Sequence, residues 1–91
     1  MTLRITRDRD APSVLKLTGR IRSGELEEIK SEMERAEKIV ALDLAEVTLI
    51  DLDGVRFLAS SEIAGVSIIN CSPYIRDWVA RERAFLGEKG V

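Results

Sequence analysis

The fold is decided by one stretch of this 91-residue chain, Val40–Val55 (VALDLAEVTLIDLDGV). The stretch opens with a short apolar run, which is typical of a strand buried on both faces. Residues 51–54 (DLDG) then predict a turn, after which the apolar residues follow a helical spacing. The stretch therefore predicts a strand that brings the carboxylates of Asp51 and Asp53 to the start of a helix.

The rest of the chain predicts strands and helices that pack around this unit. A polar hairpin connection joins the first two strands, and Gly19 is expected to end the second. Ser23 is expected to cap the first helix, Asp53 the second, and Gly65 to close the second. Ser72-Pro73 predicts the start of the third helix. In chain order we expect strands over 2–6 and 13–18, a helix over 24–37, a strand in two parts over 39–44 and 47–50, a helix over 53–62, a strand over 66–70 and a helix over 73–84.

These elements predict one small α/β domain over residues 1–91. We expect a mixed, mostly parallel sheet of about four strands with about three helices, mainly on one face, in the order β-β-α-β-α-β-α. Only 4% of the residues are aromatic, so the core should be aliphatic. Tyr74 and Trp78 are expected to join it from the third helix, and residues 85–91 are expected to fray.

The composition narrows the classes of function. The chain has 14 basic and 16 acidic residues without a long block of one sign, so no nucleic-acid surface is indicated. It has no histidine, and its one cysteine, Cys71, suggests a reducing compartment and a small core residue. No segment has the length of a membrane span, and the first residues lack the apolar core of a signal peptide. We therefore expect a cytoplasmic protein without membrane insertion.

The two aspartates allow more than one interpretation. Paired carboxylates serve acid–base catalysis or bind Mg²⁺, but this pair lacks a third oxygen ligand in the motif. A helix start attracts phosphate, but two carboxylates at its mouth repel a nucleotide. Helix capping is a sufficient role for Asp53, although it leaves Asp51 unexplained. The sequence thus predicts a protein that is not an enzyme and holds no cofactor or metal.

Residues 40–55 resemble the signature of the STAS domain, the family named for sulfate transporters and anti-sigma factor antagonists. In that family a strand of the form apolar-apolar-Asp-Leu-x-x-Val-x-x-Ile-Asp-Ser-Ser-Gly-Leu leads into a helix. Residues 15–21 (LKLTGRI) resemble the second strand of the family and the loop that leaves it. Residues 70–76 (NCSPYIR) resemble its last parallel strand and following helix start. The resemblance covers about residues 13–80.

The resemblance implies a bacterial anti-sigma factor antagonist that regulates transcription by binding an anti-sigma factor that is also a serine kinase. In the family, phosphorylation of a serine just before the motif glycine dissociates the complex. That serine maps onto Asp53, and Leu52 replaces the serine before it. The partner-binding residues implied in this sequence are Arg20, Ile21, Ser23, Asp51, Leu52, Asp53, Gly54, Val55 and Arg56.

Aspartate at position 53 departs from the family pattern and leaves two interpretations. Asp53 either mimics a permanent phosphoserine with a smaller charge, or marks a member that has lost the switch and binds constitutively. Loss is favoured, because a carboxylate lacks the third oxygen and bulk of a phosphate. The alternative function is an accessory subunit of a membrane transporter for lipids or anions, a role of some stand-alone STAS proteins. Whether the chain forms a homodimer is left open.

Overall fold

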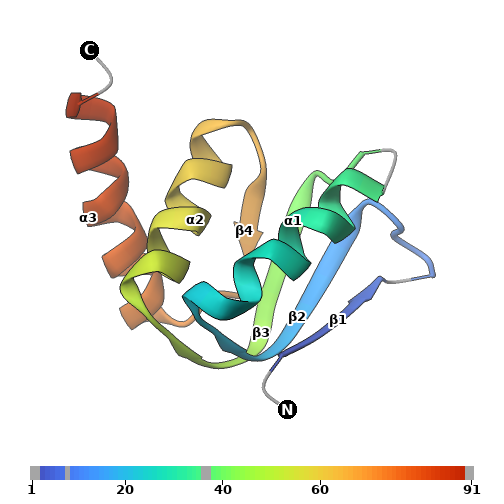
Figure 1. The fold of residues 1–91 in the computed structure, drawn as a ribbon. Helices are drawn as coiled ribbons and strands as arrows, with labels where there is room; N and C mark the ends of the chain where they lie inside the picture. The colour runs from blue at the N-terminus through green and yellow to red at the C-terminus, as the bar shows by residue number, and fades with distance from the viewer. Residues whose placement is uncertain (1–2, 8, 36–37, 90–91) are drawn as a thin grey trace.

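The computed structural model describes residues 3–7, 9–35 and 38–89 of the chain. These residues form a four-stranded mixed sheet and three α-helices (Figure 1). The elements are β1 Leu3–Arg7, β2 Val14–Ile21, the 3₁₀ turn η1 Ser23–Glu25, α1 Leu26–Arg35, β3 Ala41–Ile50, α2 Leu52–Ile63, β4 Ser67–Ile69 and α3 Pro73–Lys89. The predicted α/β class and the alternation of strands and helices are confirmed at this level.

The sheet has the order β1-β2-β3-β4. β1 and β2 pair antiparallel across the predicted hairpin connection, whereas β2–β3 and β3–β4 pair parallel. Parallel neighbours need a crossover connection, and α1 and α2 supply the two crossovers. The carboxyl ends of β2 and β3 therefore meet at one end of the sheet, where α1 and α2 begin.

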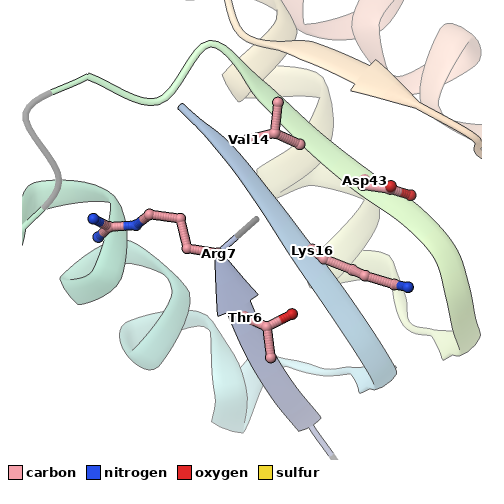
Figure 2. A pocket seen from close by; sticks show the side chains of 5 residues that line it. All are labelled: Thr6, Arg7, Val14, Lys16 and Asp43. Atoms are coloured by element: carbon pink, nitrogen blue, oxygen red, sulfur yellow. The ribbon is translucent and has the colours of Figure 1, made fainter. Parts of the chain in front are cut away.

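One face of the sheet carries the core and the other is open. Leu15 and Leu17 point from β2 into the core, while Lys16 between them lies on the opposite, partly exposed face (Figure 2). α2 stands beside α3 on the core side of the sheet (Figure 1). The core is aliphatic, as predicted, and its largest fully buried side chains are Leu15, Leu17, Ile21, Ile29, Leu42, Leu44, Val55, Leu58, Ile75 and Val79.

β2 and β3 differ from the sequence prediction by more than one residue at an end. β2 does not end at Gly19 but runs on to Ile21, with Gly19 at a φ of 106° inside the strand. β3 is one continuous strand rather than two parts. Its register against β2 shifts twice, between Lys16 and Thr18 and between Gly19 and Arg20, and each shift leaves an extra residue on β3. The extra residues bulge out of β3, and at the second shift Gly19 on β2 adopts the left-handed backbone that glycine tolerates.

The helix starts also need correction. Ser23 is not the N-cap of α1; a 3₁₀ turn comes first, and the amide of Arg22 donates to Glu25 Oε1 at 3.2 Å. α1 ends at Arg35, and the last two residues of the predicted 24–37 helix lie outside the described residues. α3 begins at Pro73 as predicted but runs to Lys89, beyond the expected end at 84. The fraying of residues 85–91 stays a prediction.

Glu62 with Arg76 and Arg83 forms a cluster of one acid and two bases that holds α3 against α2 and β4. Glu62 on α2 accepts a hydrogen bond from Arg76 at 2.9 Å, and the second guanidinium nitrogen of Arg76 donates to the Ile68 carbonyl at 3.0 Å. Arg76 therefore joins three elements, and it should stabilise the fold more than an exposed ion pair does. Tyr74, predicted to lie in the core, instead points outward with 57% of its surface exposed, whereas Trp78 is half-buried against the core.

Candidate functional site

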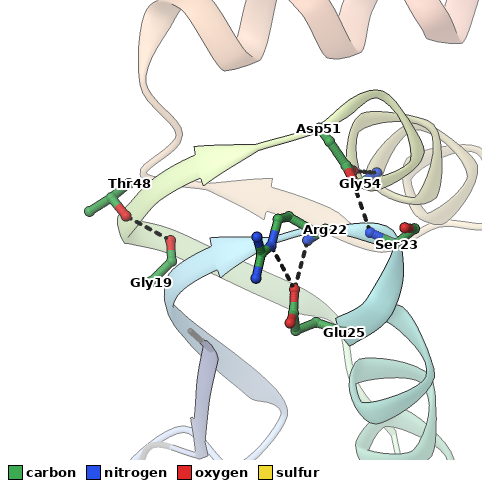
Figure 3. A network of polar contacts seen from close by, with 7 residues as sticks. All are labelled: Gly19, Arg22, Ser23, Glu25, Thr48, Asp51 and Gly54. Carbon is green, nitrogen blue, oxygen red and sulfur yellow. Dashed lines mark hydrogen bonds and ion pairs between the residues drawn. The ribbon is translucent and has the colours of Figure 1, made fainter. Parts of the chain in front are cut away.

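The candidate site is the turn between β3 and α2, and Asp51 organises it. The backbone of Asp51 is extended, with φ −102° and ψ 179°, as an N-cap residue requires. Its Oδ1 accepts a hydrogen bond from the Gly54 amide at 2.8 Å, and its Oδ2 accepts one from the Ser23 amide at 3.1 Å (Figure 3). One carboxylate thus caps α2 and holds the loop that follows β2.

This arrangement corrects the predicted role of the two aspartates. The cap of α2 is Asp51 and not Asp53, because α2 already begins at Leu52. The backbone adds a further link, since the Asp51 amide donates to the Ile21 carbonyl at 3.1 Å. The sequence prediction gave the cap to Asp53 and left the role of Asp51 unexplained. Asp51 is therefore the structural residue of the turn.

Gly54 lets α2 approach the sheet closely. A Cβ atom at this position would lie 2.7 Å from Cγ1 of Ile50 and 2.9 Å from the carbonyl oxygen of Ile21. Real side chains do not tolerate such a contact with backbone. The glycine of the motif is thus a packing requirement, and it places the first turn of α2 directly on the ends of β2 and β3.

Asp53 is left exposed at the second position of α2. No described residue donates a hydrogen bond to its carboxylate or forms an ion pair with it. Its charge lies near the positive end of the helix dipole, which stabilises it modestly. Asp53 is therefore not needed for the turn itself, and its carboxylate is available to a partner.

An open groove of about 320 Å³ begins at Asp53 and runs between α1, α2 and the last turns of α3. Its apolar lining comes from all three helices, and its polar lining comes from α1 and α2. The lining residues are Leu26, Lys30, Asp53, Arg56, Phe57, Ser60 and Leu86. Arg56 is tied to Glu82 of α3 by an ion pair of 3.1 Å, which fixes one wall of the groove.

Exposed leucines flank the turn. Leu49 is 44% exposed at the end of β3, and Leu52 is 40% exposed at the start of α2. Leu49 did not belong to the predicted site, because in the sequence it reads as one more apolar residue of a buried strand. Only the second register shift between β2 and β3 turns it outward. Within residues 49–53 the chain thus exposes two leucines and one unpaired carboxylate, a mixture of apolar and charged groups of the kind that binds proteins.

The other predicted site residues divide into supporting and exposed ones. Ile21 and Val55 are fully buried, so their side chains hold the turn and do not reach its surface. Ser23 contributes its backbone amide to Asp51. Arg20 and Arg56 are exposed. We call the exposed surface formed by Arg20, Leu49, Leu52, Asp53 and Arg56 together with the adjoining groove the turn face.

Both oxygens of Asp51 are engaged by backbone amides, and the described residues hold no cluster of three or more acidic, cysteine or histidine side chains placed to bind a metal. Cys71 lies apart at the end of β4, half-buried against the core. Burial raises the pKa of its thiol, which the Arg76 charge opposes and the Glu62 charge assists.

No protein-family model and no curated protein matches this chain. Within the described residues, no helix is both long and apolar enough to traverse a lipid bilayer.

Proposed function

We propose that this protein is a non-enzymatic interaction module that acts like an anti-sigma factor antagonist. Its partner would be a kinase-like anti-sigma factor or a related regulator, bound through the turn face. The observation that carries the proposal is the different role of each of the two aspartates. Both carboxylate oxygens of Asp51 accept hydrogen bonds from backbone amides of the turn and of the loop after β2. Leu52 and Asp53 are exposed on the backbone that these bonds hold in place.

A turn held in a fixed conformation matters because binding costs less free energy when the bound conformation already exists in the free protein. The Asp51 carboxylate bridges two loops that are 28 residues apart in the chain, and Gly54 packs the helix start onto the sheet. A partner that docks here meets two leucines and one fixed charge in a preset geometry. Such a site suits recognition of another protein surface.

Asp53 supports constitutive binding rather than a switch. Aspartate has no hydroxyl, so a serine kinase cannot phosphorylate this position. It carries about one negative charge, against about −1.5 to −2 for phosphoserine, and lacks the third oxygen. Because Asp53 is not the helix cap, its retained charge is better explained by a contact with a basic group of the partner.

The test is affinity capture from the source cells with matched variants on α2. Leu52→Glu places a charge in the turn face, whereas Ile63→Glu makes the same change at the other end of α2, where Ile63 is 52% exposed. We expect the wild type and Ile63→Glu to capture an ATP-binding regulator of the anti-sigma class, and Leu52→Glu to lose it. Direct titration of the purified pair would then give the loss in affinity.

Two outcomes would contradict the proposal. Capture that Leu52→Glu leaves intact would show that the partner binds elsewhere. Recovery of subunits of a membrane transporter, lost in the same variant, would assign the turn face to the accessory-subunit role instead. Asp53→Ser gives a further check, since it restores a hydroxyl at the motif position and should be phosphorylated when the captured regulator is a serine kinase.

A further inference from the structure

A second surface lies along the free edge of β1. Only β2 pairs with β1, so β1 forms one edge of the sheet. In an antiparallel strand every second residue directs both its N–H and its C=O away from the paired neighbour. Within Leu3–Arg7 these groups face outward and form a template for one more strand.

The edge is basic. β1 contains Arg4 and Arg7, both exposed, and no acidic residue. Lys16 lies one strand further in, facing a cavity of about 290 Å³ that Thr6, Val14 and Asp43 also line (Figure 2). None of the three cations forms an ion pair with a described residue. The one carboxylate in this cavity is Asp43, whose Oδ1 accepts from the Ala45 amide at 2.9 Å.

The charges argue against a second copy of the chain as the occupant. Antiparallel pairing of two β1 strands about Ile5 would place the arginines of both copies along one seam. Like charges on neighbouring strands are unfavourable. An acidic strand at the same edge would instead place a carboxylate against Arg4 on the open face and satisfy the outward backbone groups.

We propose that the free edge of β1 binds an extended acidic segment of a partner protein as a fifth strand. The alternation of β1 defines the pattern of that segment. Arg4 and Thr6 belong to the open face of the sheet, and Ile5, half-buried, belongs to the core face. Carboxylates on the open side and an apolar residue beside Ile5 therefore complete the strand. This surface goes beyond the turn face and is independent of it.

The probe is a synthetic peptide in which glutamate alternates with valine, about eight residues long so that it spans β1. Its addition to the isotope-labelled protein is expected to slow amide hydrogen exchange in Leu3–Arg7 and to leave α2 unchanged. A peptide of the same length with lysine for glutamate is the charge control. Arg4→Glu should weaken binding by about tenfold or more, because like charges across strands repel.

Lys38→Glu is the matched variant, since it makes the same change of charge at an exposed lysine outside β1. It should leave the affinity for the glutamate peptide within about twofold of the wild type. The proposal is overturned when a saturating glutamate peptide leaves the β1 amides unprotected, or when the lysine peptide binds as well. Concentration-dependent protection of β1 without peptide would show that a second copy occupies the edge. Leu52→Glu should not affect the peptide, so the two proposals fail separately.

Discussion

Replacing Asp51 and Asp53 one at a time separates the structural aspartate from the exposed one. Asp51→Ala removes the N-cap bond to Gly54, which is worth about 1 kcal/mol. It also removes the bond from the Ser23 amide to a charged oxygen, worth about 1.5 kcal/mol at this exposed position. The expected loss in the free energy of unfolding is therefore about 2–3 kcal/mol, out of the roughly 5–15 kcal/mol typical of a domain.

Asp53→Ala should behave differently. The change removes a favourable charge near the helix start, worth about 0.3–1 kcal/mol. Alanine regains up to about 0.7 kcal/mol through its higher helix propensity. The two terms nearly cancel, so the free energy of unfolding should change by less than about 0.5 kcal/mol. Asp51→Asn is the intermediate case, because asparagine keeps one acceptor oxygen for the cap but presents an amide where Ser23 needs a second acceptor.

The assay is equilibrium unfolding in urea, followed by the fluorescence of the half-buried Trp78 and by circular dichroism. For a small domain, a loss of 2–3 kcal/mol lowers the midpoint by about 1–2 M urea. We expect the order of stability wild type, Asp53→Ala, Asp51→Asn, Asp51→Ala, with the first two nearly equal. Equal losses at positions 51 and 53, or a larger loss at 53, would refute the assignment of the cap to Asp51.

Three further predictions use the same unfolding measurement or simple chemistry. Gly54→Ala should lower the free energy of unfolding by about 1–3 kcal/mol because its Cβ would overlap the Ile21 carbonyl. Gly24→Ala, where no atom lies within 4 Å of the added Cβ, should leave stability nearly unchanged, and similar effects at both glycines would contradict the close packing at Gly54. Ile75→Ala should cost about 2–5 kcal/mol and Tyr74→Ala less than about 0.5 kcal/mol, and a large loss at Tyr74 would place its ring in the core after all. Burial raises the pKa of the Cys71 thiol, so alkylation at pH 8 should be slower in the folded than in the urea-unfolded protein, and an equal rate in both states would speak against burial. The free energy of unfolding should also fall as pH rises through the ordinary thiol range, because the unfolded chain then loses the thiol proton more readily than the folded protein.

The two proposed surfaces are formed by different elements of the fold. The turn face lies where the carboxyl ends of β2 and β3 meet the first turn of α2. The basic edge lies along β1, which is separated from β3 by β2. A small domain can join two partners, or two segments of one partner, when its binding surfaces do not overlap. Measuring the turn-face partner in the presence of the glutamate peptide would show whether the two sites act independently.

The sequence by itself determined the class of the fold, because periodicity is a local property of the chain. Alternation near Leu17, helical spacing after Gly54 and the Ser72-Pro73 signal are each set by a few neighbouring residues, and the structure agrees with them in kind. The same holds for Gly65, where the predicted helix closure is confirmed. Its φ is 103°, and the hydrogen bonds from the Gly65 amide to Glu62 and from the Val66 amide to Ser61 close the end of α2.

Only the tertiary structure decided which aspartate holds the turn and which side chains face the solvent. Asp51 became the cap because the pairing of β2 with β3 brings the Ser23 amide to it across 28 residues, a contact that no local pattern encodes. Leu49 faces outward because of a register shift, and on α3 Ile75 is buried in the core while Tyr74 is exposed. The sequence thus pointed to the turn at residues 51–54, and packing between distant segments assigned the carboxylate of Asp51 to the fold and left that of Asp53 exposed.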